Sequence, residues 1–517
     1  MPQFERLLAD LTRPQAYPHP VQSVEVVQTH ISAVFLTGDH AYKLKKPLNL
    51  GFLDFSSVEK RAFYCKEELR LNRRLAPNLY LDVLPVIETD GHARIGGEGE
   101  PIDYVLHMRQ FDPEQQLDRL LERGELGVDF IDRLIPIITR FHQQAEKAPE
   151  DSDFGRPEVV FEPMQQNFDQ LRDLISDASE QKCLDTLEEW TQTEYRRLKP
   201  LLQERRDLGF VRECHGDMHL GNMTLFEGEI AIFDGIEFNP HFRWIDVANE
   251  IAFLVMDLES RGAVQLAHHA LNAWLEATGD YDALALMRFY QLYRAMVRAK
   301  VASIRLAQPG ISATERESIL GEYHRYLDLA EEYARPGQPA LLVTHGFSGS
   351  GKTTLSGQIV DGLGAIRVRS DLERKRLHGL SPKTDSHSGL GTGLYEETAT
   401  EKTYAHLRDL ADRILRAGYL AIVDATFLKR DLRERFAGLA TEREVPFLIL
   451  AIDADYDTLR SRLHKRRGDI SEATAAVLRH QQRQLEPLGD DEPVLHLDSE
   501  HPLPPEHIAR KLYSAQS

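Results

Sequence analysis

The chain has 517 residues, of which 42% are hydrophobic and 28% are charged, and its formal net charge is −20. This length predicts two or three domains, each able to bury a core, and the composition is typical of a water-soluble globular protein. No apolar run reaches the roughly 20 residues that cross a bilayer. The charged N-terminal segment lacks the apolar core of a signal peptide, so we expect a cytoplasmic protein with no membrane partner.

The cysteines and the charge distribution limit the function further. Cys65, Cys183 and Cys214 form no CxxC pair, which argues against a disulfide framework or a cysteine-based zinc site. From residue 336 onward there are 25 Lys and Arg against 26 Asp and Glu, so nearly all of the net charge lies before that point. We interpret this acidity as a solubility feature, and the alternative is a cationic substrate. Neither interpretation favours non-specific nucleic-acid binding by the first part.

The first part of the chain changes from strand patterns to helix patterns. Residues 20 to about 112 contain several short apolar strands, interrupted by one predicted helix at about 57–75. Residues from about 113 to 333 are mainly helical in pattern, with a short β region near 210–235. A β-rich N-lobe followed by a helical C-lobe is an α+β layout typical of a bilobal protein-kinase-like fold, and we expect residues 1–333 to form that domain.

The segment "ARPGQPA", residues 334–340, contains two Pro and one Gly and is predicted to be a linker. After it, strands alternate with helices up to the C-terminus. This alternation predicts a second domain, residues 341–517, of the α/β P-loop NTPase type, with a parallel sheet covered by helices on both faces.

Residues 214–222 read "CHGDMHLGN", and the apolar stretch "AIFDG" then brings Asp234 twelve residues after Asn222. Phosphoryl transfer from ATP needs a group that orients the attacking hydroxyl and ligands that hold Mg²⁺. Asp217 is the candidate that accepts the hydroxyl proton, and Asn222 and Asp234 are the candidate magnesium ligands. Each motif alone is weak, since an Asp after a strand is often a helix cap, but their order predicts a kinase-like catalytic loop.

A candidate phosphate-binding lysine lies upstream, in the predicted strand "HAYKLKK". Lys43 and Lys45 share one face of this strand because side chains alternate along it. Lys43 also has the Ala-x-Lys spacing of a kinase strand, although no GxGxxG precedes it. The following helix offers Glu67 or Glu68 as the ion-pair partner. We favour Lys43 with Glu68, and Lys45 and Glu67 remain alternatives.

These motifs resemble those of the aminoglycoside phosphotransferase and choline kinase-like family. The likeness covers about residues 20–330 and rests on His215, Gly216, Asp217, Asn222 and Asp234. It implies a kinase that uses ATP and Mg²⁺ and acts on a small compound with a hydroxyl group. The segment "WIDVANE" adds to the resemblance, which implies that Asp246 is a structural residue bracing the catalytic loop.

A basic helix face is predicted near the end of the first domain. Arg294 and Arg298 lie four residues apart and therefore on one face, with Lys300 and Arg305 nearby. This face either binds a phosphate or acidic substrate, or braces acidic side chains within the fold. We favour the structural interpretation. Binding of a phosphate or acidic substrate by this face would conflict with the hypothesis of a cationic substrate that the net charge suggests.

Residues 346–353 read "GFSGSGKT" and match the phosphate-binding loop G-x-x-x-x-G-K-[ST], between a predicted strand and a predicted helix. The glycines let backbone N–H groups surround phosphates at the N-terminus of that helix. Lys352 is expected to reach the β- and γ-phosphates of ATP, and Thr353 to ligate Mg²⁺. The residues expected to contact the nucleotide are Gly346, Ser348, Gly349, Ser350, Gly351, Lys352, Thr353 and Thr354.

Two acidic residues follow predicted strands of the second domain. Asp371, trailed by Arg374, is expected to contact the acceptor hydroxyl and to serve as its base. Asp424 is expected to bind Mg²⁺ or its waters. For both residues the alternative is a helix cap. The absence of an NKxD motif argues against a GTPase.

A basic stretch, "DTLRSRLHKRRGDISEA", contains Arg460, Arg462, Arg466 and Arg467. Arginines stabilise charge on a transferring phosphoryl group, so we expect a mobile lid whose Arg462 and Arg466 contact the nucleotide. The alternative is a solvated helix face. The Gly- and Ser-rich segment 381–397 is a candidate acceptor-binding loop.

The second domain resembles P-loop kinases related to the 5′-polynucleotide kinase, gluconate kinase and zeta-toxin group, over residues 340 to about 515. The likeness rests on the P-loop, Asp371, Arg374, Asp424 and the basic stretch. The whole chain is similar to bacterial proteins that combine an aminoglycoside phosphotransferase-like domain with an ATP-binding domain. This implies a bifunctional phosphotransferase with two separate Mg-ATP sites and small-molecule hydroxyl acceptors. The alternatives are a regulatory protein with one active site, or a P-loop domain that is a nucleic-acid 5′-end kinase.

Overall fold

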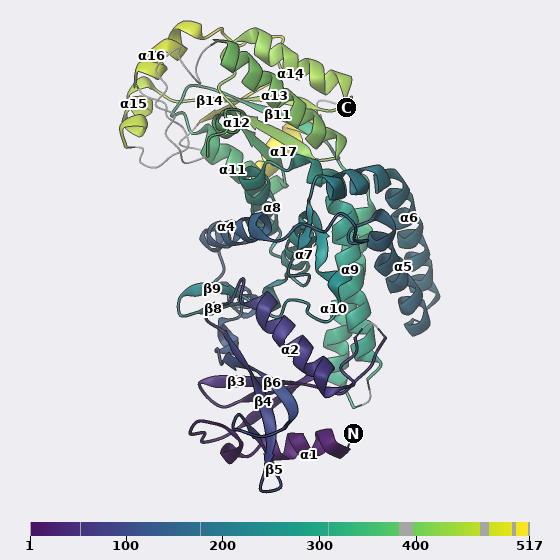
Figure 1. Ribbon diagram of the computed structural model, residues 1–517. Coiled ribbons are helices and arrows are strands. Elements are labelled where there is room, and N and C mark those ends of the chain that lie inside the picture. Colours follow the sequence, from purple (N-terminus) through teal and green to yellow (C-terminus); the bar gives the residue numbers. More distant parts are fainter. Residues whose placement is uncertain are drawn as a thin grey trace. The chain divides into compact units, whose positions relative to one another are not determined.

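The computed structural model of the protein describes residues 2–51, 53–175, 177–308, 310–381, 397–465, 475–498 and 503–514. The chain folds into two compact units (Figure 1). We call Met1–Asp257 with Phe289–Leu327 the first unit, and Leu258–Arg288 with Asp328–Ser517 the P-loop unit. This division differs from a single boundary at 334–340, because residues 258–288 pack within the P-loop unit. The boundary at 334–340 stays a prediction.

The first unit begins with a six-stranded antiparallel sheet in the order β1-β2-β3-β6-β4-β5. Side chains alternate along β3, so Lys43 and Lys45 lie on one face and Tyr42 and Leu44 on the other. The helices α1 and η1 join Tyr42 and Leu44 in one apolar core. These elements are α1 (Pro2–Leu11), η1 (Pro14–Ala16), β1 (Glu25–Gln28), β2 (Ser32–Leu36), β3 (His40–Lys45), β4 (Tyr80–Thr89), β5 (His92–Ile95) and β6 (Pro101–Arg109).

The lysine face of the sheet carries α2 (Val58–Asn72), which packs on β4 and β6. The helix starts at Ser57, whose hydroxyl accepts a backbone N–H of the first turn at 3.3 Å. Its buried side chains include Arg61, Cys65 and Glu68, which share one face through their spacing of four and three residues. Arg61 pairs with Asp103 of β6 at 2.9 Å. This packing brings Glu68 to the lysines of β3.

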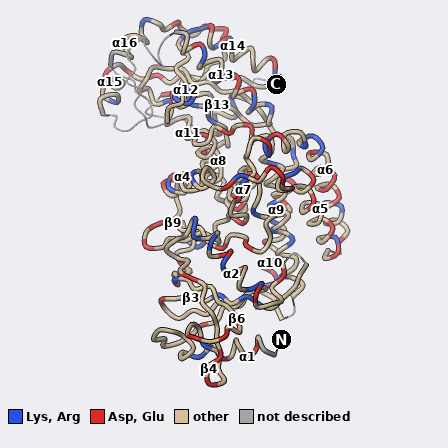
Figure 2. The backbone as a smooth tube through the Cα atoms, in the orientation of Figure 1, with Lys and Arg blue, Asp and Glu red and all other residues tan. Residues whose placement is uncertain are grey.

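The rest of the first unit is mainly helical. β7 pairs with β10, and β8 forms a hairpin with β9. The helices α5 and α6 pack together, and Figure 2 shows basic and acidic residues interspersed along both, which fits the solubility interpretation of the net charge. These elements are η2 (Pro113–Gln115), α3 (Leu117–Glu122), α4 (Val128–Gln144), α5 (Pro157–Leu174), α6 (Ala178–Asp207), β7 (Val211–Glu213), η3 (Leu220–Asn222), β8 (Met223–Phe226), β9 (Glu229–Ile232), η4 (Pro240–Phe242), β10 (Trp244–Asp246), α7 (Val247–Ser260), α9 (Leu284–Leu306) and α10 (Ala313–Ala334).

The P-loop unit contains a five-stranded parallel sheet in the order β12-β13-β11-β14-β15, as the alternation of strands and helices predicts. The central strand β11 is buried along its whole length, and α11 and α17 pack on one face of the sheet. Its elements are α8 (Val264–Thr278), η5 (Tyr281–Ala283), β11 (Ala340–His345), α11 (Lys352–Leu363), β12 (Ile366–Arg369), α12 (Ser370–Leu377), α13 (Glu397–Arg416), β13 (Leu420–Asp424), α14 (Arg430–Glu442), β14 (Phe447–Asp453), α15 (Tyr456–Lys465), α16 (Ala475–Gln484), β15 (Val494–Asp498) and α17 (Pro505–Ser514). Among the described residues of the chain, no helix has the length and apolar character needed to cross a membrane.

The edge strand β12 is covered by α8 and η5. The Asn272 carboxamide oxygen accepts the Arg367 backbone N–H at 2.7 Å, and the Tyr281 hydroxyl donates to the Arg367 carbonyl at 3.2 Å. Glu276 accepts from Arg367 Nε at 2.7 Å. An uncovered edge strand offers its backbone groups to other chains, and here Asn272 and Tyr281 pair with the N–H and carbonyl groups of Arg367 on that edge. This segment is therefore an integral part of the P-loop unit.

Candidate active sites

The catalytic loop of the first unit follows β7 and brings Asp217 and Asn222 together. Asn222 Nδ2 donates to Asp217 Oδ2 at 2.9 Å and to the Asp217 carbonyl at 3.0 Å. His219 Nε2 lies 3.5 Å from Asp217 Oδ2. Burial raises the pKa of Asp217, but His219 and Arg298 outweigh this effect and hold the pKa well below its usual range. The Asp217 carboxylate thus lies beside His219 and the Asn222 carboxamide.

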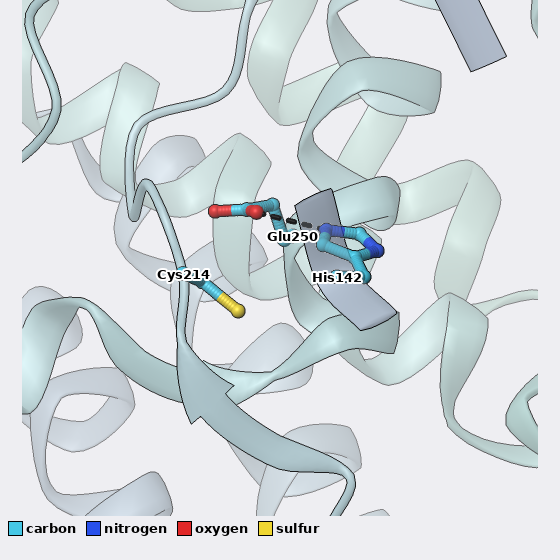
Figure 3. Close-up of side chains that lie close together, drawn as sticks. All are labelled: His142, Cys214 and Glu250. Carbon is cyan, nitrogen blue, oxygen red and sulfur yellow. Dashed lines mark hydrogen bonds and ion pairs between the residues drawn. The ribbon is translucent and has the colours of Figure 1, made fainter. Parts of the chain in front are cut away.

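The backbone of this loop is held by a buried carboxylate on α7. Glu250 Oε1 accepts the N–H groups of His215 and Gly216, both at 2.7 Å. Glu250 Oε2 lies 2.9 Å from His142 Nε2, and Figure 3 shows the imidazole of α4 facing the carboxylate. Gly216 is also held through its carbonyl oxygen, which accepts a hydrogen bond from Arg294 at 3.0 Å. The peptide groups just before Asp217 are thus fixed by charged partners.

Gly216 is required at its position in this loop. Its φ of +88° lies in the left-handed region, where side chains are strained. A Cβ atom there would also stand 2.6 Å from the Phe242 carbonyl oxygen. Only glycine permits this path of the backbone into Asp217.

Asp246 does not have the role that the family resemblance implies. It pairs with Arg205 at 2.7 Å, and its other oxygen accepts the Ala248 N–H at the start of α7 at 2.9 Å. The loop is braced instead by Glu250 and by Asp257, which accepts the Leu220 N–H at 2.9 Å. These two acids lie seven residues apart, two turns along one face of α7. The segment "WIDVANE" thus contains an acid that braces the loop, but this acid is Glu250 and not Asp246.

His142, Cys214 and Glu250 form a cluster of potential metal ligands, whose ligand atoms lie within 4.8 Å of one another. Figure 3 shows the three side chains. The hydrogen bonds of the cluster favour a structural role, because the Glu250 oxygens already accept two N–H groups and face His142. Burial raises the pKa of the Cys214 thiol well above its usual value, whereas metal ligation needs a thiolate. The thiol lies 3.5 Å from the Ile245 carbonyl oxygen, to which it donates.

The two lysines of β3 both contact Glu68. Lys43 Nζ lies 2.7 Å from Glu68 Oε1 and 2.7 Å from Asp234 Oδ1, while Lys45 Nζ lies 2.6 Å from Glu68 Oε2. Lys45 also pairs with the buried Glu237. Burial raises the pKa of Glu68, but Lys43 and Lys45 outweigh it and lower the pKa to about 2. Lys43 is the lysine that reaches the candidate metal ligand Asp234.

Glu67, the alternative partner, points elsewhere. It pairs with Arg70 at 2.6 Å and with Arg243 at 3.0 Å. The structure therefore brings together Lys43, Lys45 and Glu68, and leaves Glu67 in a separate ion-pair group.

Asn222 and Asp234 flank the β8–β9 hairpin and lie at the same end of it, since Met223 pairs with Ile232. Asp234 has a φ of +61°, and its N–H donates to the Tyr80 hydroxyl at 3.0 Å. Asp234 is exposed, and the Asn222 carboxamide donates to Asp217 through its nitrogen. An exposed carboxylate and an amide oxygen fit the preference of Mg²⁺ for oxygen ligands.

The basic helix face on α9 has mainly structural interactions. Arg294 donates to Asn249 at 2.7 Å as well as to the catalytic loop. Arg298 donates to the Tyr326 hydroxyl at 3.2 Å and pairs with Glu322 at 3.2 Å. Lys300 donates to Asn167 at 2.6 Å, and Arg305 pairs with Glu322 at 3.3 Å. These hydrogen bonds and ion pairs agree with the structural interpretation of this face.

In the P-loop unit, the chain passes from β11 through residues 346–351 to the N-terminus of α11. Gly349 and Gly351 have φ values of +90° and +101°, which favour glycine. A Cβ atom at Gly346 would stand 2.6 Å from the Ile452 carbonyl oxygen. Lys352 Nζ donates to the Phe347 carbonyl at 2.7 Å. The backbone N–H groups of this curled loop and the start of a helix form a fitting site for phosphate.

A cavity of about 430 Å³ lies beside this loop. It is lined by Lys352, Thr353, Asp371, Arg374 and Asp424 among others, so the structure brings together the predicted lysine, magnesium ligands and base. Ser348, Gly349 and Gly351 also line it, whereas Gly346, Ser350 and Thr354 are not among its lining residues. A carboxylate and a hydroxyl beside a phosphate-binding loop fit a magnesium ion.

The two acids sit at the carboxyl edge of the sheet. Asp371 lies in the first turn of α12, directly after β12, and Asp424 ends β13. Asp424 Oδ2 accepts from the Ser356 hydroxyl of α11 at 3.3 Å. Because parallel strands end at one edge, ligands of such sheets bind there.

Part of the predicted lid cannot be compared with the structure. Arg466 and Arg467 lie outside the described residues, as does most of the predicted acceptor loop, residues 382–396. Arg462, on α15, donates to the Ser350 carbonyl of the P-loop at 3.3 Å. Arg460 is exposed on the same helix.

Sequence reasoning missed one wall of the cavity. Four residues of α16 line it: Val477, His480, Gln481 and Gln484. Their spacing of three, one and three residues is that of a single helix face. That spacing was visible in the sequence, but no motif marked it, because its function depends on where the helix packs.

Comparisons with known proteins agree with these observations. Residues 341–488 match the family model described as AAA domain. An uncharacterized protein of Mycobacterium tuberculosis is 28% identical over 462 residues, which cover 89% of this chain and 90% of that protein. The gluconokinase of Gluconobacter oxydans is 29% identical over 173 residues, 32% of this chain and 86% of that protein.

Among solved structures, amicoumacin kinase hAmiN in complex with AMP-PNP, Ca²⁺ and Ami is similar over 63% of this chain and 93% of that chain, at 15% identity and a TM-score of 0.39. The named relative of the C-terminal part is a kinase, in agreement with the motifs of that part. Residues 341–488 thus resemble an AAA domain, and the C-terminal part of the chain is similar to a gluconokinase.

Proposed function

We propose that the chain is a bifunctional ATP-dependent phosphotransferase with one Mg-ATP site in each unit. The observation that supports this proposal is that each unit contains its own set of candidates: a lysine, a carboxylate that could act as base and a pair of oxygen-bearing side chains. In the first unit these are Lys43, Asp217, Asn222 and Asp234. We further propose that the first unit is bilobal, with the strand-rich sheet as N-lobe and the helices as C-lobe.

At the first site, Asp217 accepts the proton of the acceptor hydroxyl as the phosphoryl group is transferred. His219 and Arg298 lower the pKa of its carboxyl group, and Asn222 donates a hydrogen bond to one of its oxygens. Lys43, oriented by Glu68, holds the phosphates of ATP, and Asn222 and Asp234 hold Mg²⁺. The bound ion neutralises charge on the phosphates.

At the second site, the P-loop backbone and Lys352 hold the β- and γ-phosphates of ATP. Thr353 and Asp424 hold Mg²⁺, and Asp371 takes the proton of the acceptor hydroxyl. Among the described arginines, Arg374 and Arg462 are proposed to stabilise the negative charge that develops on the transferred phosphoryl group. Arg466, Ser350 and Thr354 remain proposed nucleotide contacts.

The acceptors are proposed to be small molecules with a hydroxyl group. A cavity of about 430 Å³ beside the P-loop falls within the size range of small-molecule sites. The likeness to a gluconokinase over 173 residues supports a small polyhydroxyl acceptor for this site. A nucleic-acid 5′ end is the second candidate, because Arg369, Arg374 and Lys429 line the same cavity.

The proposal is tested with γ-labelled ATP and a metabolite extract. The full chain is expected to label two products. Asp217→Asn is expected to abolish one product and Lys352→Ala the other, since each variant removes a group from one site. If one variant abolishes both labels and the other abolishes neither, only one site turns over, and the regulatory alternative holds. Labelling of an oligonucleotide with a 5′-hydroxyl instead of a metabolite supports the nucleic-acid alternative.

A further inference from the structure

Gln481 joins α16 to the phosphate-binding loop through both ends of its carboxamide. Its Oε1 accepts the Ser348 backbone N–H at 3.0 Å, and its Nε2 donates to the Ser348 hydroxyl at 2.9 Å. The two residues are 133 positions apart in the chain. Ser348 is thereby held by a residue outside the loop. Lys352 and Arg462 contact the loop at different points, because they donate to the carbonyl groups of Phe347 and Ser350.

This contact lies at the cavity beside the phosphate-binding loop. Ser348 and Gln481 line the same cavity as Lys352 and Asp371. Lys352 reaches the β- and γ-phosphates in loops of this type, and Asp371 is the candidate base for the acceptor hydroxyl. The phosphates that Lys352 is expected to reach, the γ-phosphate among them, therefore lie in the cavity that Ser348 and Gln481 line.

The chemistry of the carboxamide allows a further contact. A glutamine side chain has two N–H donors and a carbonyl with two lone pairs. The pair with Ser348 uses one N–H and one lone pair. A second N–H donor is left for an oxygen of a phosphoryl group in the cavity.

We propose that Gln481 is a positioning residue that holds Ser348 on the γ-phosphate side of the loop, so that the P-loop site distinguishes ATP from ADP. This inference rests on the proposed nucleotide site of the P-loop unit. Loss of the two hydrogen bonds frees Ser348 to move away from the terminal phosphate, while the β-phosphate remains held by the loop N–H groups and Lys352.

The test is calorimetric binding of AMP-PNP and of ADP to the full chain, with Lys43→Met present throughout so that the first site does not contribute. Gln481→Leu is expected to weaken AMP-PNP binding about tenfold and ADP binding by less than about twofold. Gln482→Leu, an exposed neighbour on the same helix, is the matched control and should leave both affinities unchanged.

Gln481→Glu separates positioning from simple support of the helix. A glutamate accepts the Ser348 N–H and the Ser348 hydroxyl and so keeps the connection, but it adds a negative charge beside the terminal phosphate. We expect it to weaken AMP-PNP binding more than ADP binding. Equal effects on the two nucleotides, or wild-type behaviour of both Gln481 variants, overturn the inference. If Lys352→Ala leaves nucleotide binding intact in this background, the proposed P-loop site itself fails.

Discussion

Glu250 is the residue on which the geometry of the catalytic loop depends most directly. Its side chain is fully buried, but its carboxylate oxygens accept hydrogen bonds from two backbone N–H groups and lie beside the imidazole of His142. Burying an ionised carboxylate is costly unless its oxygens are paired. Burial raises the pKa of Glu250, and His142 outweighs it, so the pKa stays below its usual value.

His142→Phe is expected to lower the free energy of unfolding by about 2 kcal/mol, because it leaves one oxygen of a buried carboxylate without its donor. His142→Gln, which keeps an N–H donor, is expected to cost less. Urea unfolding of the two variants checks this, together with the rate of the Asp217-dependent reaction. Equal destabilisation by Phe and Gln contradicts a role for the hydrogen bond to Glu250.

The two lysines of β3 are expected to differ in function. Lys45 is 1% exposed and lies between Glu68 and Glu237. Lys45→Met leaves two buried carboxylates without their shared cation and is expected to cost about 3 kcal/mol of stability. Lys43→Met is expected to cost less stability and to abolish the first labelled product, because Lys43 is the lysine beside Asp234. Thermal or urea unfolding and the labelling assay separate the two effects, and reversed outcomes would reassign the lysines.

The Glu68 ion pairs make a pH-dependent contribution to stability. Lys43 and Lys45 overcome the effect of burial and lower the Glu68 pKa from 4.5 to about 2. A group with a depressed pKa stabilises the fold above its unfolded pKa and loses that contribution as pH falls through the folded pKa. The difference in free energy of unfolding between the wild type and Glu68→Gln is therefore expected to be constant above pH 5 and to shrink from about pH 4.5 toward pH 2. Denaturant unfolding over this range measures it, and a difference that grows on acidification refutes it.

At the scale of elements, residues 258–288 pack on the sheet of the P-loop unit, although the residues that contact β12 precede it by 86 and 95 positions in the chain. Asn272 and Tyr281 satisfy the outward N–H and carbonyl of Arg367 on the edge strand β12. Helix α8 also packs against α11, the helix that begins with Lys352. Helix α11 of the P-loop unit is therefore supported by α8, which lies before residue 340 and outside the segment that carries the P-loop motifs.

A fragment that begins at residue 341 is expected to fold less stably than the P-loop unit of the full chain and to self-associate. The reason is that β12 then exposes a free strand edge. Size-exclusion chromatography and thermal unfolding of the fragment, compared with the full chain, check this expectation. Asn272→Leu in the full chain is the milder companion variant, and a monomeric fragment of unchanged stability contradicts the supporting role of α8.

At the scale of the whole molecule, the two proposed sites share only a need for ATP and a divalent cation. Chelation with EDTA is expected to abolish both labelled products, and added Mg²⁺ to restore them. Asp234→Asn is expected to remove the first product alone and Asp424→Asn the second alone, since each removes one carboxylate ligand. The γ-labelled ATP assay measures both products. Loss of both products in either single variant shows that the reactions are not independent.

The sequence by itself determined those features that are local in the chain. The P-loop, the loop around Asp217 and the alternation of strands and helices after residue 340 are contiguous patterns, in which spacing alone sets backbone shape and side-chain direction. It also narrowed the lysine and carboxylate candidates to two each. The Ala-x-Lys spacing and strand alternation indicated Lys43 and Lys45, and the following helix offered Glu67 and Glu68.

Only the tertiary structure decided between those candidates. Glu68 rather than Glu67 and the wall formed by Gln481 depend on which face of a helix packs inward. The support of the loop by Glu250, while Asp246 pairs with Arg205, depends on tertiary packing. So does the attachment of α8 to β12. Such choices are made by interactions between residues far apart in the chain, whose energies no local pattern records.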